Sequence, residues 1–241
     1  MLENFEKTSL IKNDGEELLF NKVHAGELMT NSTFAQALYL ALTNRMPEYK
    51  IVEMIDTILI AILVESKCSP STLCSKLAAQ TGANLNTAMA AGLSSMNMLH
   101  GLNIEENMNI LTGAVKDMKD INLSFDDQAE ITVQYCHDNS IILHGYGNQF
   151  DSTDLRVKKL IDRCKELGFD GDYVKLAQSI EKAHKSVFNL DLKLNIEGLV
   201  AAILLEIGID AAAGPAFFMI AKMPLMAASF LEVKKNIQKQ I

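Results

Sequence analysis

Three short stretches decide how this chain folds: Met98-Leu99-His100-Gly101, Gly145-Tyr146-Gly147-Asn148 and Leu194-Asn195-Ile196-Glu197-Gly198. Each joins a polar side chain to a glycine, within a sequence that otherwise has the apolar spacing of helices. Glycine permits backbone conformations that other residues avoid, and polar residues at such places often carry function at the edge of a packed core. The stretches therefore predict a helical protein with a site to which distant parts of the chain contribute.

The composition favours helices packed on helices. Of the 241 residues, 49% are hydrophobic and only 6% are aromatic, Trp is absent, and Met, Leu, Ala and Ile are abundant. Strand patterns are scarce, because Val and Ile mostly fall at helical spacing. The net charge of -8 repels phosphate backbones and anionic lipid, so neither nucleic acid nor a membrane is expected as a partner.

The most apolar stretches, residues 51–64 and 199–230, are interrupted by charged residues and prolines, which argues against a membrane span. No secretory segment is recognised at the start of the chain. The cysteines are not spaced as metal ligands are in known motifs; they are Cys68, Cys74, Cys136 and Cys164. We interpret the cysteines as reduced core thiols and expect a cytoplasmic protein without a metal site.

Apolar periodicity and cap residues predict helices over residues 33–44, 47–65, 69–82, 84–100, 105–120, 125–138, 153–167, 172–187 and 197–207, and two short helices over 212–221 and 225–239. Small residues such as Ala88 and Gly92 allow a neighbouring helix to approach closely. His100 is expected at the end of its helix, with Gly101 as a left-handed cap.

In this order the stretches resemble the active-site segments of the citrate synthase superfamily, most closely its short branch, the stand-alone citryl-CoA lyases. Asp154-Leu155-Arg156 keeps the spacing of the Asp-Pro-Arg of that family, and the resemblance extends from about residue 10 to residue 232. It implies an all-α, citrate synthase-like fold. Residues 1–104 and 206–241 would form a large helical domain that dimerises, and residues 105–205 a small helical domain on the CoA and substrate side of a cleft.

The resemblance assigns the thioester chemistry to His100 and Glu197. The histidine of the family donates a hydrogen bond to the thioester carbonyl and stabilises the enolate. Glu197 stands where the family has an aspartate that removes or returns the methyl proton. Its extra methylene displaces the carboxylate, which can cost on the order of 10²-fold in rate. Without the resemblance, both residues could simply complement helix dipoles.

The loop of Gly145, Tyr146 and Gly147 is expected on the CoA and substrate side, because main-chain amides with a guanidinium form a seat for carboxylate or phosphate. The resemblance implies that Arg156 binds a carboxylate of the acid substrate. Asn148 replaces a histidine that contacts the carbonyl or hydroxyl of that acid, and an amide cannot move a proton near neutral pH. The alternative is a plain turn before a solvated helix.

Two further positions differ from the family. Ser66, within Glu65-Ser66-Lys67, stands where relatives have the histidine of Asp-His-Gly, and Lys222 replaces an arginine that clamps a substrate carboxylate. Lys supplies charge without the planar fork of Arg. The plainer interpretation is a helix end and a surface cation. His144, four residues before Asn148, is an alternative source of an imidazole.

Two main functions remain open at this point. The first is a citryl-CoA lyase-like enzyme that cleaves or forms the bond between an acetyl-CoA unit and an oxaloacetate-like acid, with a CoA thioester as substrate and no covalently bound cofactor. The second is a silent relative that binds CoA or regulates a partner. A purely structural helical protein is a third, weaker alternative. The resemblance implies a homodimer in each of the first two cases.

Overall fold

The computed structural model describes residues 10–13, 15, 17–65, 68–147 and 154–239. The chain forms two compact units, Met1–Asp56 and Thr57–Ile241. The boundary lies within helix α3 (Tyr49–Leu63). Each unit is described by itself below. The division into a large domain and a small domain of residues 105–205 stays a prediction.

The first unit begins with a small antiparallel sheet in the order β1-β2-β3, formed by β1 (Ile11–Asn13), β2 (Leu18–Phe20) and β3 (Val23–His24). Helices α1 (Ala25–Asn31) and α2 (Phe34–Thr43) follow, and α1 packs on β2 and β3.

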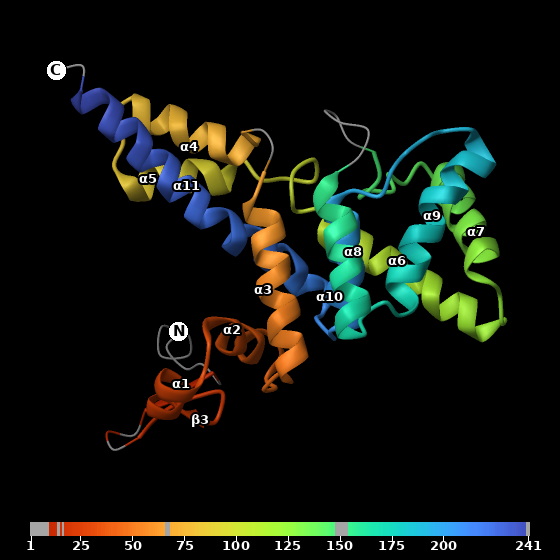
Figure 1. Ribbon diagram of the computed structural model, residues 1–241, viewed down its shortest axis with the longest axis horizontal. Coiled ribbons are helices and arrows are strands. Elements are labelled where there is room, and N and C mark those ends of the chain that lie inside the picture. Colours follow the sequence, from red (N-terminus) through yellow and green to blue (C-terminus); the bar gives the residue numbers. More distant parts are fainter. Residues whose placement is uncertain (1–9, 14, 16, 66–67, 148–153, 240–241) are drawn as a thin grey trace, which may run out of the picture. The chain divides into compact units, whose positions relative to one another are not determined.

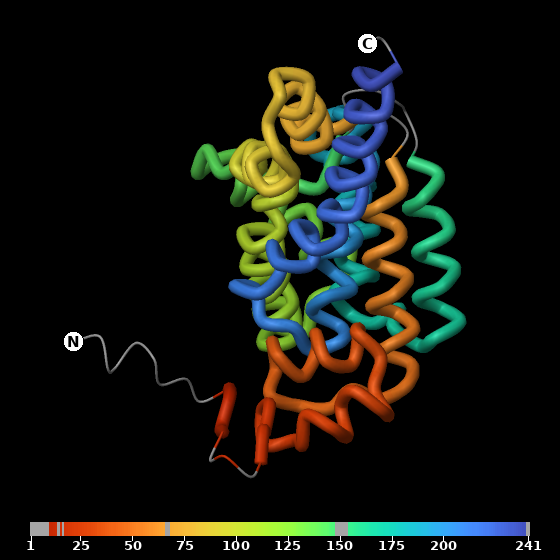
Figure 2. Tube along the Cα trace, turned by 90° about the vertical axis from the view of Figure 1, so that its left-hand side faces the viewer, coloured from red at the N-terminus to blue at the C-terminus, as the bar shows by residue number. Residues whose placement is uncertain are grey.

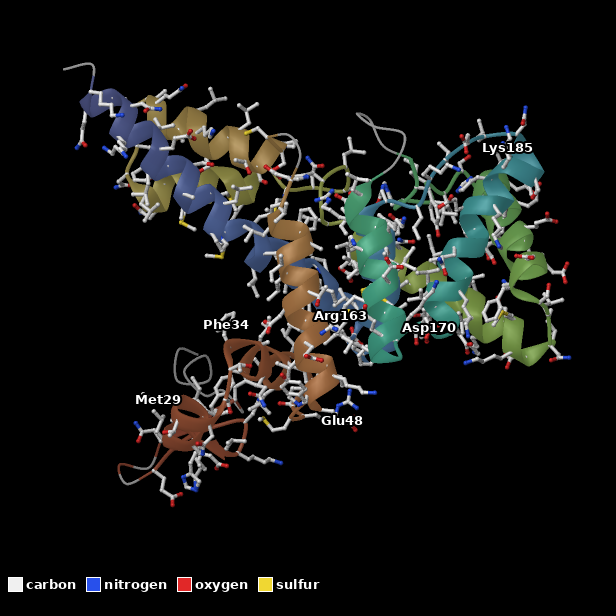
Figure 3. All side chains as sticks on the ribbon, viewed as in Figure 1. Met29, Phe34, Glu48, Arg163, Asp170 and Lys185 are labelled. Carbon is white, nitrogen blue, oxygen red and sulfur yellow. The ribbon has the colours of Figure 1, made fainter. Side chains whose placement is uncertain are left out.

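Helix α2 begins at a capping box, in which Thr33 accepts from the backbone of Gln36 and the Gln36 side chain accepts from the backbone of Thr33. Met29 and Phe34 project from this unit with 85% and 70% of their surface exposed (Figure 3).

The second unit contains the remaining helices. Helices α4 (Pro70–Gln80), α5 (Leu85–Ser94) and α11 (Gly214–Gln238) pack together (Figure 1). The others are α6 (Ile104–Asp120), α7 (Phe125–Asp138), α8 (Leu155–Leu167), α9 (Asp172–Phe188), α10 (Ile196–Glu206) and the 3-10 turn η2 (Ala211–Ala213). Apart from the small sheet, the described chain is helical, as predicted.

Helix α10 forms the core of the second unit. Every residue from Leu199 to Leu204 is fully buried, and the helix packs against α6, α8 and α9. A helix that is apolar on all sides needs neighbours on all sides. Its N-terminus, which carries Glu197, is thereby held in a fixed place.

The close approach predicted at the small residues of α5 is confirmed. A Cβ added at Gly92 would overlap the sulfur of Met226 in α11 and lie 2.8 Å from the carbonyl oxygen of Ser71 in α4. A larger residue at position 92 would therefore separate α5 from both neighbours.

Two helix predictions are wrong. Helix α5 ends at Ser94, so His100 does not lie on it. The segment after η2 is one long helix instead of two short ones, with Pro224 inside it (Figure 2). A proline removes one helical hydrogen bond, yet this helix continues because Phe218 before it and Met226 after it are both buried and hold the two halves in place.

The residues Ala211–Gln238 are long and apolar enough to cross a membrane by length and composition, and 44% of the most apolar window is buried inside the protein. A core helix of a globular domain passes the same test. Here α11 packs against α4, α5 and α6. The expectation of no membrane partner stays a prediction.

The cysteines are all free. Cys136 and Cys164 are buried, as expected of core thiols, and Cys74 is partly buried. Cys68 is exposed, so the interpretation of all the cysteines as core residues is wrong for this one. It lies in the connection before α4, outside the helices that form the core.

Candidate active site

The second and third quoted stretches lie against each other. The backbone N–H of Gly147 donates to Lys193 at 2.7 Å, and that of Asn195 donates to Gly145 at 2.9 Å. The side chain of Asn195 also donates to the carbonyl oxygen of Gly147 at 2.9 Å. The loop after α7 is therefore hydrogen-bonded directly to the N-terminus of α10, which begins at Ile196, the residue after Asn195.

Gly145 and Gly198 meet where no side chain would fit. Gly145 has φ +89°, and a Cβ there would lie 2.5 Å from the Cα of Gly198. A Cβ on Gly198 would overlap the carbonyl oxygen of Gly145. Gly147 also has a positive φ, +82°. The glycines predicted to shape a tight, open loop thus allow it to touch the start of α10.

Glu197 lies in the first turn of α10, as predicted. Asn195 caps the helix by accepting from the backbone N–H groups of Glu197 and Gly198. The Glu197 carboxylate accepts a 2.8 Å hydrogen bond from the Asn103 side chain, and the nearby backbone of Gly101 also favours its ionised form. Burial nevertheless raises the pKa of the Glu197 carboxyl above its ordinary value. This carboxyl can therefore hold a proton at higher pH than a surface glutamate.

His100 lies in a turn rather than on a helix, so its expected role at a helix end is wrong. Asn97 and His100 exchange backbone hydrogen bonds of 2.8 and 3.2 Å, and Gly101 follows with φ +84°. A Cβ at Gly101 would overlap the ring of Phe218, which packs on the His100 imidazole with centroids 5.4 Å apart. The sequence correctly predicts a left-handed backbone conformation at Gly101. This residue, however, follows the turn of residues 97–100 and does not end a helix.

The imidazole of His100 is held by Ser71, whose Oγ lies 2.9 Å from its Nε2. Ser71 is fully buried in the first turn of α4. Burial and the nearby ammonium of Lys222 lower the pKa of His100 below its ordinary value. His100 is therefore neutral at neutral pH and offers one N–H donor.

Lys222 is only 3% exposed, so its interpretation as a surface cation is wrong. Its ammonium forms an ion pair with Oε2 of Glu65 and lies 5.6 Å from the centre of the Phe218 ring. The other oxygen of Glu65 accepts from the backbone of Ser69 at 3.0 Å and from the Thr72 hydroxyl at 3.1 Å. Burial alone would raise the pKa of Glu65, but the hydrogen bonds from Lys222 and Ser69 outweigh it and hold the pKa below its ordinary value.

Arg156 also binds a carboxylate of the chain. Its Nε and Nη2 donate to both oxygens of Asp154, at 2.6 to 3.2 Å, and its Nη1 donates to the carbonyl oxygens of Ala61 and Val64 at 3.2 and 2.8 Å. Asp154 also caps α8 by accepting from the backbone of Arg156. Asp151 and Ser152, which by residue type would also suit a helix cap, fall outside the described residues.

These groups influence one another electrostatically. The charge of Lys222 favours ionisation of Glu197 and disfavours protonation of His100, and Arg156 lies close enough to disfavour the charged form of Lys222. Burial is the main reason that the pKa of Lys222 lies below its ordinary value. Segments far apart in the sequence thus contribute an imidazole, a carboxylate and two cations to one neighbourhood.

The remaining site predictions have different outcomes. Asn148 and Ser66 lie outside the described residues. Tyr146 donates its hydroxyl to the carbonyl oxygen of Ala177 at 3.1 Å, and burial raises the pKa of this phenol. His144 lies close enough to Glu197 to favour its ionisation, with its Nε2 3.6 Å from a Glu106 oxygen. The binding role predicted for Tyr146 and its flanking glycines stays a prediction.

Several site residues were not predicted from the sequence. Glu65 and Ser71 lie in segments that resemble family motifs, Glu65-Ser66-Lys67 and Ser69-Pro70-Ser71-Thr72, but no role was predicted for either, and Asn103 belongs to no motif. Only the ion pair and the hydrogen bonds reveal their place. The Oδ1 atoms of Asn103 and Asn107 are buried without a hydrogen-bond partner among the described residues. Among those residues, no group of three or more His, Cys, Asp or Glu side chains is placed to hold a metal ion.

The family model "Citrate synthase, C-terminal domain" matches residues 21–241, nearly the whole chain. With the structural likeness described next, this match defines an enzyme of the lyase or synthase type. The chain belongs to the citrate synthase family. Both the resemblance inferred from the sequence and the predicted fold class are confirmed. Comparison with curated protein sequences gave no match.

Citryl-CoA lyase from Hydrogenobacter thermophilus is similar to this chain, with 27% sequence identity and a TM-score of 0.83 over 94% of this chain and 86% of that one. A variant of ATP citrate lyase from Methanosaeta concilii, in complex with (3S)-citryl-CoA, is 15% identical with a TM-score of 0.78, over 95% of this chain and 39% of that one. Citrate synthase from Thermotoga maritima is 16% identical with a TM-score of 0.58. The last two likenesses show the fold alone.

Proposed function

We propose that this protein cleaves or forms the carbon–carbon bond between an acetyl-CoA unit and an oxaloacetate-like 2-oxo acid, as a citryl-CoA lyase does. One observation carries the proposal. The Glu197 carboxylate accepts a 2.8 Å hydrogen bond from Asn103 and lies close enough to the backbone of Gly101, the residue after His100, for that backbone to favour its ionised form, so an acid and a neutral imidazole stand at one site. The likeness to the Hydrogenobacter citryl-CoA lyase supports the lyase direction over full citrate synthase.

The cleavage step balances with these groups. A proton leaves the tertiary hydroxyl, its carbon becomes the carbonyl of the 2-oxo acid, and the carbon–carbon bond breaks. Its electron pair moves into the thioester to form the enolate. A proton from Glu197 then forms the methyl group of acetyl-CoA. Synthesis is the same path reversed. The raised pKa of Glu197 suits this role, because the group must be protonated before cleavage and ionised before synthesis.

His100 stabilises the enolate oxygen. A neutral imidazole is the appropriate donor, since its N–H can bind the developing charge without giving up a proton completely. Ser71 fixes the ring through Nε2, and Phe218 fixes its plane. A donor that is already in place loses no energy to reorganisation when the enolate forms.

The tertiary hydroxyl also needs a proton acceptor. The amide of Asn148 cannot take this role near neutral pH. We assign it to His144, which lies on the same loop, has a side chain that is 11% exposed, and lies close enough to act on Glu197. Replacement by Gln keeps a polar side chain and removes the base, so H144Q should slow cleavage and leave the binding of CoA esters intact.

The proposal includes a cytoplasmic homodimer in which the CoA thioester is a substrate rather than a bound cofactor. Exposed apolar side chains on α3, α4 and α11 support a second copy as partner, namely Ile60, Leu73, Leu77 and Leu231. Sedimentation of the purified protein tests this part. A monomer at micromolar concentration would contradict it.

Two measurements test the proposed chemistry. Incubation with (3S)-citryl-CoA should release acetyl-CoA and oxaloacetate in equal amounts. In D2O the methyl protons of acetyl-CoA should exchange when a 2-oxo acid or its hydroxy analogue is present, and mass spectrometry follows this exchange. If the protein catalyses neither reaction over a range of acids and pH, the proposal has no support.

A silent, CoA-binding relative is the second candidate. The observation that favours it is the pairing of both expected substrate-binding cations with carboxylates of the chain. Calorimetry with acetyl-CoA distinguishes the two candidates, because the silent relative binds the ester with no turnover and no proton exchange.

A further inference from the structure

The acid side of the site carries little net charge. Lys222 and Arg156 are the two cations that the family resemblance assigns to substrate carboxylates, and each already binds a carboxylate of the chain, Glu65 and Asp154 respectively. A dicarboxylate acid would have to lose its hydration and enter a site where both cations, Lys222 and Arg156, are already neutralised by carboxylates of the chain. This is costly unless new partners replace the lost hydration.

The Lys222–Glu65 pair is built into the protein. The side chains are 4% and 12% exposed, and the second Glu65 oxygen is held by Ser69 and Thr72. A substrate carboxylate could reach Lys222 only by displacing Glu65, which would leave a largely buried anion without its cation. Such an exchange is strongly unfavourable, because removing one partner of a buried ion pair leaves a charge that nothing compensates.

The Arg156 pair is different. Its side chain is 27% exposed, and the bonds to Asp154, Ala61 and Val64 use four of the five N–H groups of the guanidinium. One N–H on Nη2 remains for a single substrate carboxylate. Phe218, which contacts both His100 and Lys222, presents an apolar ring beside the compensated lysine.

We propose that Glu65 is a specificity-determining residue that occupies the second carboxylate position, so that the acid partner is a 2-oxo acid with one carboxylate. This inference rests on the proposed function and names the substrate class of the same site. A 2-oxo acid with a small apolar group, such as pyruvate, places its carboxylate near Arg156 and its methyl group near Phe218. The corresponding thioester is citramalyl-CoA, which would be cleaved to acetyl-CoA and pyruvate by the same bond changes.

The test compares kcat/KM for citramalyl-CoA, as each enantiomer, with kcat/KM for (3S)-citryl-CoA in the unaltered protein. We expect citramalyl-CoA to be preferred by about tenfold or more, since a charged hydrogen bond that is not made is worth roughly 1.5 to 3 kcal/mol. A preference for citryl-CoA overturns this inference and leaves the proposed function standing. If the protein cleaves neither thioester and catalyses no methyl-proton exchange, both this inference and the proposed function are overturned.

Three variants assign the preference to Glu65. Glu65→Gln frees the Lys222 charge and should shift the ratio toward citryl-CoA by about tenfold or more. The double variant Glu65→Gln with Lys222→Met removes both charges and should keep the preference for citramalyl-CoA. Glu232→Gln removes the carboxylate partner of Lys76 in a surface ion pair between α4 and α11 and should leave the ratio unchanged.

Thermal unfolding of each variant identifies any that fail to fold, and the substrate comparison in the unaltered protein stands without them. An unchanged ratio in a folded Glu65→Gln protein would contradict the role given to Glu65. Equal shifts in Glu65→Gln and Glu232→Gln would do the same, because they would report a general charge effect.

Discussion

The proposed thioester side, with His100 and Glu197, and the proposed acid side, with Lys222 and Arg156, are built in different ways. On the thioester side, Glu197 accepts its 2.8 Å hydrogen bond from the neutral amide of Asn103, whose Oδ1 is buried without a partner among the described residues. On the acid side, Lys222 and Arg156 are both paired with carboxylates. The difference indicates that the groups proposed for enolate chemistry have no ion-pair partner among the described residues, whereas those proposed for acid recognition are already paired with carboxylates of the chain. A protein that had lost all activity would have no reason to keep one side free of ion pairs while both cations of the other side are paired.

The largest effect is expected from Glu197→Gln, which tests whether the thioester side is catalytic. The amide keeps the size and the hydrogen bonding to Asn103 but cannot transfer a proton, so turnover and methyl-proton exchange should fall by about 10³-fold. Glu166→Gln is the matched control, because its carboxylate is 62% exposed in a surface ion pair. Full activity in the Glu197 variant would place the proton transfer elsewhere.

Replacing the imidazole should have a somewhat smaller effect. His100→Ala removes one donor from the enolate oxygen, and loss of one such donor costs about 10² to 10³-fold in kcat. Most of the loss should appear in kcat rather than in KM, since the donor acts in the transition state. A change confined to KM would assign His100 to binding alone.

Stability tests the contact between the loop after α7 and the first turn of α10, which carries Glu197. Gly145→Ala combines a positive φ with an overlap at Gly198 and should lower the free energy of unfolding by about 3 kcal/mol. Gly168 has a similar φ, +80°, but nothing within 4 Å of an added Cβ, so Gly168→Ala should cost only about 1 to 2 kcal/mol. Denaturant unfolding of both variants separates the backbone strain from the steric overlap, and equal losses would contradict the contact.

The smallest expected effect is in the titration of His100. Its pKa lies below the ordinary value, so the folded protein binds fewer protons here than the unfolded chain, and this contribution to stability falls as the pH drops below about 6.5. NMR of the imidazole should show the pKa rising in Lys222→Met and falling further in Glu65→Gln, because one change removes a repelling charge and the other an attracting one. Shifts of the same sign would contradict the electrostatic assignment.

Much of the helical fold could be predicted from the sequence because the signals are local. Phe125–Asp138 matches the predicted range, and the Asn84 cap of α5 accepts from Thr87 as such a cap should. The errors lie where packing overrides local preference. Pro224 predicts a break, but burial on both sides keeps α11 continuous, and His100 leaves the helix because Gly101 must pass under Phe218.

The site could be predicted only in part. Motif spacing located His100, Glu197 and Arg156, since each is tied to glycines or caps that can be recognised along the chain. The role of Glu65 could not be predicted, because its partner lies 157 residues away and a single carboxylate at a helix end has no distinctive pattern. The charge state of the acid side thus depends on a long-range pair that only the tertiary structure brings together.

The apposition of Gly145 and Gly198 has a practical consequence for anyone who wishes to redesign this enzyme. Residues 145–147 and 193–198 are interlocked, and an inserted methyl group at either glycine would push them apart. Loop grafts from relatives should therefore move both segments together as one cassette. Mutant libraries that vary only one of these two segments will mostly contain proteins in which the two segments no longer fit together.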